Sequence, residues 1–240
     1  MTAIFSRIGP VPWRRLLVRS ALVGLIAVLL LSVNRTKAPG CEAFVPVPNM
    51  AIIAHAGGGL PERSYANNIE AMDLAYAHGL RVFEIDLRET FFGDIVLAHD
   101  WIERFDPRAV RIERALEWLR AHPDTQLVTD FKTDNLRGLA RLAELAGAER
   151  TRIVPQIYQP SEYRGALALR MGLPIFTLYR NRDPEWMSFA NSAKLTAVTL
   201  PEALAHRAPE IRPPVFVHTV NVPVRMDGVS GYYSDCLIPG

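Results

Sequence analysis

Two pairs of charged residues lie inside apolar runs of the 240-residue sequence. Glu84 and Asp86 are two residues apart in FEIDLRE, and Asp130 and Lys132 are two apart in LVTDFKTD. Because alternate residues of a strand point to the same side, each pair is expected to face one way. Three carboxylates that meet at one point repel each other unless a cation lies between them, and carboxylate oxygens suit Mg²⁺ or Ca²⁺. Glu84, Asp86 and Asp130 are therefore candidate ligands of one divalent cation, with a salt bridge to Lys132 as the alternative role of Asp130.

Two histidines end apolar runs in the same part of the sequence. His55 follows the run at 52–54 and precedes three glycines, and His99 follows the run at 95–98. The imidazole pKa lies near neutrality, so two such rings suit one proton donor and one proton acceptor. A metal ion, an acid and a base together are suited to cleaving a phosphodiester. The glycines are expected to let a phosphate approach the backbone, while a purely structural role is the alternative for a single histidine.

Strand-like and helix-like segments alternate from residue 51 onward. Strands that are apolar on both faces and alternate with helices are typical of a parallel α/β fold. We expect a TIM (β/α)8 barrel, in which the C-terminal ends of the strands meet at one mouth; an open doubly wound sheet is the alternative. The expected strands are at 51–56, 81–87, 126–131, 152–158, 174–179, 196–200, 215–220 and 229–233, with a short extra strand at 94–100. The expected helices are at 67–78, 113–121, 136–146, 161–171, 184–193 and 201–207.

The last two units of this barrel are expected to be abbreviated. The stretch at 222–228 is too short for a normal seventh helix, and the sequence ends at Gly240 without room for an eighth. The length and the high apolar content favour one sizeable core. The formal net charge of +2 gives no electrostatic basis for nucleic acid as a partner.

The N-terminal region differs from the rest of the chain. Residues 1–15 are basic and precede an apolar stretch at 16–33, which is just long enough to cross a bilayer. We expect a cytoplasmic N-terminus, an uncleaved transmembrane anchor at 16–33, a Pro-rich linker at 34–49 and a barrel domain at 50–240. The basic residues would place that domain on the extracytoplasmic side of the cell membrane. A cleaved signal peptide, giving a secreted protein, and a buried helix of the globular domain are the alternatives.

The chain has two cysteines, Cys41 and Cys236, at the two ends of the part that we expect to be exported. Export permits a disulfide between them, and two unpaired thiols are the alternative. Their spacing and the absence of flanking histidines exclude a metal site made by these cysteines.

The order of several short motifs resembles that of the glycerophosphodiester phosphodiesterase family. The motifs HAGG, YANNIEAM, GLRVFEID and DIVLAHDW are followed by LVTDFKTDN, IVPQIY, TLYR, VHTVN and GVSGYYSD. The chain is most similar to the membrane-attached branch with His-Ala-Gly-Gly, which is related in fold to phosphatidylinositol-specific phospholipase C. The resemblance implies a TIM-barrel phosphoric diester hydrolase that splits a glycerophosphodiester into glycerol phosphate and an alcohol. It also implies that His55 and His99 are catalytic and that Glu84 and Asp86 form the metal-binding Glu-x-Asp.

Other positions match the family pattern only in part. Asp130 stands where the family usually has a third metal-binding glutamate, and Lys132 matches the lysine two residues on. The usual Glu-Asn-Thr is Ala-Asn-Asn here, so an acidic residue is missing while Asn67 remains. His218 replaces the tryptophan of the seventh-strand Trp-Thr-Val-Asn. We expect Lys132, Asn67 and His218 to contact the substrate, with a helix cap as the alternative role of Asn67.

The usual His-Arg-Gly is His-Ala-Gly in this chain, so an expected phosphate-binding arginine is missing. Arg63 or Arg88 is a candidate replacement. Asp235 is expected either to line the pocket or to cap a loop. Trp101 and Tyr179 are each expected either in a lipid or sugar pocket or in the core, and the core is the favoured place for Trp101.

Two functions of different classes remain open from the sequence. The first is metal-dependent hydrolysis of a glycerophosphodiester or a lysophospholipid, with one Mg²⁺ or Ca²⁺ ion, by a protein that its N-terminal helix attaches to the membrane. The second is a catalytically reduced barrel that acts as a binding or assembly module at the membrane surface. The missing arginine and the short last units favour the second, whereas the two histidines and Glu-x-Asp favour the first.

Overall fold

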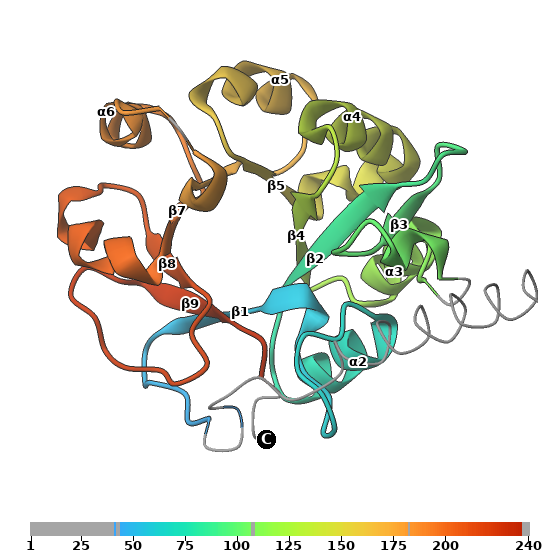
Figure 1. The fold of residues 1–240 in the computed structure, drawn as a ribbon, viewed down its shortest axis with the longest axis horizontal. Coiled ribbons are helices and arrows are strands. Elements are labelled where there is room, and N and C mark those ends of the chain that lie inside the picture. Colours follow the sequence, from blue (N-terminus) through green and yellow to red (C-terminus); the bar gives the residue numbers. More distant parts are fainter. Residues whose placement is uncertain (1–40, 42–43, 107–108, 182, 237–240) are drawn as a thin grey trace, which may run out of the picture. The chain divides into compact units, whose positions relative to one another are not determined.

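Eight parallel strands close into a barrel in the computed structural model of the protein (Figure 1). The structure describes residue 41 and residues 44–106, 109–181 and 183–236. The first strand pairs with both the second and the last, so the ring of strands is closed. This confirms the expected TIM barrel and excludes the open sheet. The strands of the ring are β1 (Ala51–Ala54), β2 (Val82–Glu89), β4 (Gln126–Phe131), β5 (Ile153–Ile157), β6 (Ile175–Thr177), β7 (Ala197–Pro201), β8 (Val215–His218) and β9 (Gly231–Ser234).

The additional strand predicted after the second one is also present. It is β3 (Ile95–Leu97), which pairs antiparallel with β2 and lies outside the ring. Asp86 still pairs with β4 within the ring. Glu89, three residues further along β2, pairs with Ile95 of β3, so the hairpin of β2 and β3 extends beyond the ring. After β3 the chain returns to the level of Asp86, whose carbonyl accepts a hydrogen bond from the amide of Ala98.

Helices surround the barrel on the outside (Figure 1). In α3 (Ile112–Ala121), four buried residues recur at the spacing of one helical face, and this face packs on the sheet: Ile112, Ala115, Leu116 and Leu119. The other α-helices are α2 (Ile69–Ala77), α4 (Asn135–Ala146), α5 (Tyr163–Ala168) and α6 (Trp186–Ser192).

The unit between β8 and β9 is abbreviated, as predicted, whereas the end of the last unit lies outside the described residues. After β7 the chain forms a 3₁₀ helix, Glu202–Glu210, which contains Pro209. Proline has no backbone N–H group to donate, which disfavours a regular α-helix here. Between β8 and β9 the described residues form turns and no helix.

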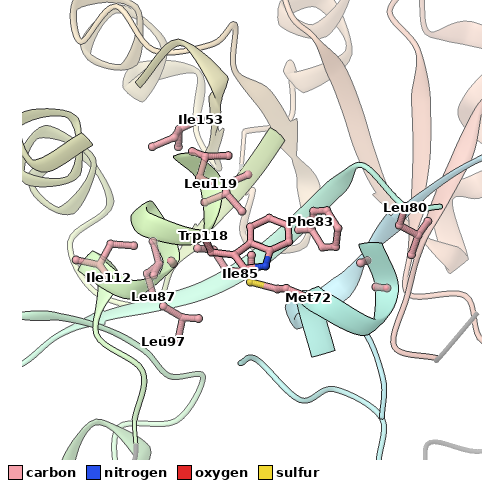
Figure 2. Packing of buried hydrophobic residues seen from close by; sticks show 14 of the residues in the cluster. Met72, Leu80, Phe83, Ile85, Leu87, Leu97, Ile112, Trp118, Leu119 and Ile153 are labelled. Carbon is pink, nitrogen blue, oxygen red and sulfur yellow. The ribbon is translucent and has the colours of Figure 1, made fainter. Parts of the chain in front are cut away.

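The outward face of β2 builds much of the core between the barrel and its helices (Figure 2). Phe83, Ile85 and Leu87 are completely buried there, and the ring of Phe83 lies 4.9 Å from that of Trp118 on α3. Since side chains alternate along a strand, this packing turns Glu84 and Asp86 to the inside of the barrel. The apolar residues of β2 therefore determine which way its two carboxylates point.

The inside of the barrel is divided into an apolar and a polar layer. Four buried apolar residues from successive strands pack together in the lower layer: Val128, Val154, Ile175 and Ala197. Two positions further along each strand, and so nearer to the mouth, stand four buried polar residues: Asp130, Gln156, Thr177 and Thr199. The apolar layer closes the barrel from below, and the polar layer forms the floor of the mouth.

Cys41 and Cys236 form a disulfide with Cα atoms 5.1 Å apart, which settles the alternative that the sequence left open. The bond joins residues 195 positions apart. In the chain-entropy view, a cross-link over so long a loop stabilises the fold by up to about 5 kcal/mol. The double variant Cys41→Ser/Cys236→Ser is expected to unfold at clearly lower temperature and denaturant concentration than the parent. An unfolding midpoint that neither the substitutions nor a reductant changes would contradict this expectation.

The expected membrane anchor at 16–33 lies outside the described residues. Among the residues that the structure does describe, no helix is both long enough and apolar enough to cross a membrane.

Candidate active site

Three buried carboxylates meet at the mouth of the barrel. Glu84 and Asp86 lie on β2, and Asp130 lies on β4 directly opposite Asp86 in the strand pairing. Each offers an oxygen atom, and these oxygens lie within 4.8 Å of one another. The Oε1 atom of Glu84 is buried and has no hydrogen-bond partner. Three convergent carboxylates with an unpaired buried oxygen fit the ligand preference of a hard divalent cation.

Two cations of the chain lie against these carboxylates. Lys132 places Nζ 2.7 Å from Asp86 Oδ1 and 2.7 Å from Asp130 Oδ2. Arg180 places Nη2 3.2 Å from Asp130 Oδ1. Burial raises the pKa of Asp130, but Lys132 and Arg180 outweigh this and hold that pKa below its usual value.

In contrast to Asp130, Glu84 has a pKa above its usual value. Burial and the neighbouring Asp86 raise the pKa of Glu84 to about 8, although His55 and Lys132 act in the other direction. When no metal ion is bound, this raised pKa favours the protonated form of Glu84. A cation that binds to the cluster has to displace this proton.

Three tyrosine hydroxyls donate to the carboxylates. Tyr65 donates to Asp86 Oδ2, and Tyr158 and Tyr179 donate to the two oxygens of Asp130. Burial and the nearby carboxylates raise the pKa values of these tyrosines, so the hydroxyls remain protonated donors. The hydroxyls thus stabilise the charged carboxylates and hold them in place.

His55 stands directly after β1 at the edge of the cluster. Its Nδ1 lies 2.6 Å from Asp235 Oδ1, and its Nε2 lies 3.7 Å from Glu84 Oε2. Asn221 in turn donates to the other oxygen of Asp235 at 2.9 Å and accepts from the Asp235 amide at 3.0 Å. Burial lowers the pKa of His55, but Glu84 and Asp235 outweigh it and raise that pKa to about 9. Asp235 therefore lines the pocket and fixes the orientation of the His55 ring.

Asp235→Asn tests this orienting role. We expect the pKa of His55 to fall, because the variant loses a carboxylate that raises it, and we expect kcat for phosphodiester cleavage to fall by about 100-fold or more through loss of ring orientation. NMR titration of the histidines and steady-state kinetics measure the two effects. Asp235→Glu retains the negative charge, so its His55 pKa and its kcat should both lie closer to those of the parent than the values of Asp235→Asn do. An unchanged His55 pKa in Asp235→Asn would contradict the assignment.

His99 lies beside the Tyr65 ring, as His55 does. The Tyr65 ring centroid is 4.9 Å from that of His55 and 5.6 Å from that of His99, edge to face in both cases. The His99 side chain is 45% exposed, and its Nδ1 lies 3.0 Å from Asp100 Oδ1. The His99 backbone is fixed by Arg88, which donates to its carbonyl at 2.7 Å. The structure thus brings both predicted histidines to one mouth, with Tyr65 against each of them.

His218 forms another wall of the mouth. Its ring stacks on Tyr179 at 5.1 Å between centroids and lies 5.3 Å from the His55 ring. Burial and the charge of His55 lower the pKa of His218 to about 4, so the ring is neutral at physiological pH. The sequence left open whether Tyr179 lies in the core or in the pocket. Its contacts with His218 and Asp130 place it at the mouth.

Asn67 does not cap the helix that follows it. The side chain that caps α2 belongs to Asn68, which accepts from the amide of Ala71. Asn67 instead forms two hydrogen bonds with the backbone of Asp86. Its Nδ2 donates to the Asp86 carbonyl at 3.2 Å, and its Oδ1 accepts from the Asp86 N–H group at 3.1 Å. Asn67 therefore holds β2 at the position of a carboxylate of the cluster.

The structure identifies another candidate for the missing arginine. Arg180, which follows β6, contacts Asp130 and donates to the carbonyl of Phe131 at 2.8 Å. Of the two arginines named from the sequence, Arg88 holds the His99 backbone, and Arg63 pairs through its backbone with Leu60. The motif TLYR contains Arg180, but spacing alone gave no reason to place it beside Asp130.

Two further findings were not predicted from the sequence. Tyr65 and Asn221 belong to the site, and the only signal for either was its position within a motif. The expectation of a buried Trp101 was wrong, because its side chain is 57% exposed. Trp101 lies in a turn after His99, and its ring contacts that of Phe105.

No protein-family model matches the chain, and no curated protein matches its sequence. Solved structures do match its fold, and three of them illustrate the range. A glycerophosphodiester phosphodiesterase from Parabacteroides distasonis has a TM-score of 0.60 at 15% identity, covering 78% of this chain and 93% of that one. One from Agrobacterium tumefaciens has a TM-score of 0.52 at 19% identity, covering 78% and 95%. A phosphodiesterase from Oleispira antarctica, in complex with the product sn-glycerol-3-phosphate, has a TM-score of 0.56 at 12% identity, covering 82% and 96%. The barrel domain therefore has the fold found in glycerophosphodiester phosphodiesterases.

Proposed function

We propose that this protein hydrolyses a glycerophosphodiester or a lysophospholipid-type phosphodiester with the help of one divalent cation. The observation that carries the proposal is the meeting of Glu84, Asp86 and Asp130 beside the hydrogen-bonded pair of His55 and Asp235. A metal site next to an oriented, titratable ring is suited to phosphodiester cleavage. The shared fold supports this assignment, and so do the phosphodiesterases among the matching structures.

The binding of the phosphate follows from the positive groups at the mouth. Mg²⁺ or Ca²⁺ bound to the three carboxylates would polarise the phosphoryl group and neutralise charge that develops on it. Lys132 lies at the same place and adds a positive charge. Burial lowers the pKa of Lys132, but the surrounding carboxylates outweigh burial and raise this pKa above its usual value. Arg180, with its planar guanidinium group, is a further donor to phosphoryl oxygens. Lys132 and Arg180 together take the place of the arginine that this chain lacks after His55.

The two histidines divide the proton transfers. The bond between His55 Nδ1 and Asp235 fixes the ring and favours its protonated form, so His55 is the donor to the leaving oxygen. His99 is more exposed and accepts the proton of the attacking nucleophile. The stacked rings of Tyr179 and His218 form an uncharged wall on which the alcohol part of the substrate can pack.

The proposal includes attachment to a membrane through residues 16–33, with the barrel on the extracytoplasmic side. The disulfide between Cys41 and Cys236 supports export, because disulfides persist in oxidising compartments and are rare in the cytosol.

Hydrolysis assays with the full chain test the proposed function. We would offer a panel of glycerophosphodiesters and lysophospholipids, each with Mg²⁺, with Ca²⁺ and with a chelator. Turnover that requires a divalent cation supports the proposal, and the panel then identifies the preferred alcohol. If a folded protein that binds the cation cleaves nothing in the panel, the barrel is better described as a binding module.

A further inference from the structure

Five large apolar side chains are exposed next to the mouth of the barrel. Two of them, Phe91 and Phe92, form the tip of the β2–β3 hairpin and are 77% and 94% exposed. The others lie in the turns that follow His99. We refer to the five as the aromatic rim: Phe91, Phe92, Trp101, Ile102 and Phe105.

The aromatic rim is held in place by ordered backbone. At the hairpin, the Thr90 amide donates to the Asp94 carbonyl at 2.8 Å, and the Thr90 hydroxyl accepts from the amides of Phe92 and Asp94. In the following turns, Glu103 accepts from the amide of His99 at 2.7 Å and from that of Asp100 at 3.1 Å. These bonds present the apolar side chains to the outside of the domain, and they connect the rim to His99.

A positive charge lies among the rings. The guanidinium carbon of Arg104 is 4.5 Å from the ring centroid of Phe91 and 4.8 Å from that of Phe105. Phe105 also contacts the rings of Phe91 and Trp101, with centroids 5.8 Å and 5.6 Å apart. Exposed aromatic rings around an arginine match the interface of a phospholipid bilayer, where rings enter the headgroup region and the cation meets phosphate groups.

The disulfide shows at which end of the barrel Cys41 lies. Cys236 follows Asp235, whose carboxylate binds His55, so Cys236 lies at the mouth end of the barrel. Cys41 is bonded to it, and the apolar stretch at 16–33 ends only eight residues before Cys41. Eight residues span at most about 29 Å even when fully extended. A bilayer that holds this stretch is therefore within reach of the mouth end.

We propose that the aromatic rim docks on the surface of a phospholipid bilayer. Phe91, Phe92 and Trp101 enter the interface, Arg104 lies among the lipid phosphates, and the mouth beside His99 opens toward the lipid. The biological role of this docking rests on the proposed function, since a mouth directed at the bilayer receives a phosphodiester carried by a lipid. The docking itself can be tested without any hydrolysis assay.

Quenching of Trp101 fluorescence by brominated lipid measures the docking. The full chain is incorporated into vesicles of phosphatidylcholine and phosphatidylglycerol, with and without bromine on the acyl chains. The chain has three other tryptophans, Trp13, Trp118 and Trp186, so the signal of Trp101 is the difference between the parent and Trp101→Phe. We expect bromination to quench a larger share of the emission of the parent than of Trp101→Phe. An equal share in both proteins would overturn the proposal.

The hairpin supplies the second variant. Phe91→Ser/Phe92→Ser removes two apolar anchors, so the bromine-dependent quenching of Trp101 should fall, and the apparent KM for a lysophospholipid in vesicles should rise about tenfold or more. Turnover of a soluble glycerophosphodiester should stay unchanged. The matched control is Leu173→Ser, because Leu173 is also an exposed apolar residue but precedes β6, at the end of the barrel opposite the mouth. Equal effects of the hairpin variant and Leu173→Ser on quenching would count against docking through the rim.

Two further outcomes separate the alternatives. If acrylamide in solution fails to reach Trp101 when no vesicles are present, the rim is covered by another part of the chain and the proposal is wrong. If bromine quenches Trp101 but neither the parent nor any variant hydrolyses a phosphodiester, docking stands and the proposed function fails.

Discussion

His55→Ala and His99→Ala are each expected to lower kcat for phosphodiester hydrolysis by about 10²–10⁴-fold, the usual contribution of a general acid or base. The loss at His55 should be the larger, because this ring is buried and bonded to Asp235. His99 is half-exposed and lies at the open side of the mouth, where water can partly take over its role. Steady-state kinetics with a soluble glycerophosphodiester and saturating cation measure both losses.

The matched control for these variants is His206→Ala. His206 is an exposed histidine on the 3₁₀ helix after β7. His206→Ala therefore makes the same histidine-to-alanine change at a position outside the mouth. We expect its kcat and KM to equal those of the parent. Circular dichroism and thermal unfolding should show that all three variants are folded. Parent-like turnover in a folded His55→Ala protein would rule out the mechanism that we propose.

Glu84→Gln is expected to weaken binding of the divalent cation by about 100-fold or more, because even residues that only support a metal ligand typically contribute 10–100-fold. The variant also tests the protonation of this group. In the parent, the pKa of Glu84 is raised to about 8 by burial and by Asp86. Below that pH a cation has to displace the Glu84 proton, so affinity should rise about tenfold for each pH unit up to that pKa and level off above it. Glutamine carries no such proton, so the variant should lose this part of the pH dependence.

Isothermal titration calorimetry with Mg²⁺ and with Ca²⁺ makes this measurement without any substrate. Titrations in two buffers with different ionisation enthalpies count the protons released, and the parent should release about one more proton than Glu84→Gln at pH 7. Glu62→Gln, at an exposed position outside the cluster, is the control and should bind the cation as the parent does. If Glu84→Gln and the parent bind the cation equally well and release equal numbers of protons, Glu84 is not a ligand.

The alternation of side chains along each strand explains why so much of the site could be predicted. Along β2 the apolar residues have to face the helices, so Glu84 and Asp86 have to face the inside of the barrel. The same rule places Asp130 inside on β4. A parallel barrel then brings the ends of its strands to one mouth. Local pattern and a general property of the fold together were enough to bring the three carboxylates together.

The interactions that the sequence did not predict join parts of the chain that are far apart. His55 and Asp235 are 180 residues apart, and they meet only because β1 pairs with β9 when the barrel closes. Arg180 follows β6 and reaches Asp130 on β4 past the intervening β5, and no local pattern contains that contact. Trp101 was expected in the core, but its side chain is exposed, because burial depends on whether a partner surface exists on that side of the turn.

The sequence by itself determined the alternation of strands and helices, the direction in which each strand's polar residues point, and the set of residues able to bind a cation and transfer protons. Only the tertiary structure decided the partner of His55, the place of Tyr65 against both histidines, the pairing of Cys41 with Cys236, and the exposure of the aromatic rim. The physical reason is that periodicity is a property of neighbouring residues, since it follows from backbone geometry. Contacts and exposure depend on the closure of the whole barrel, which brings residues from the two ends of the chain to one mouth.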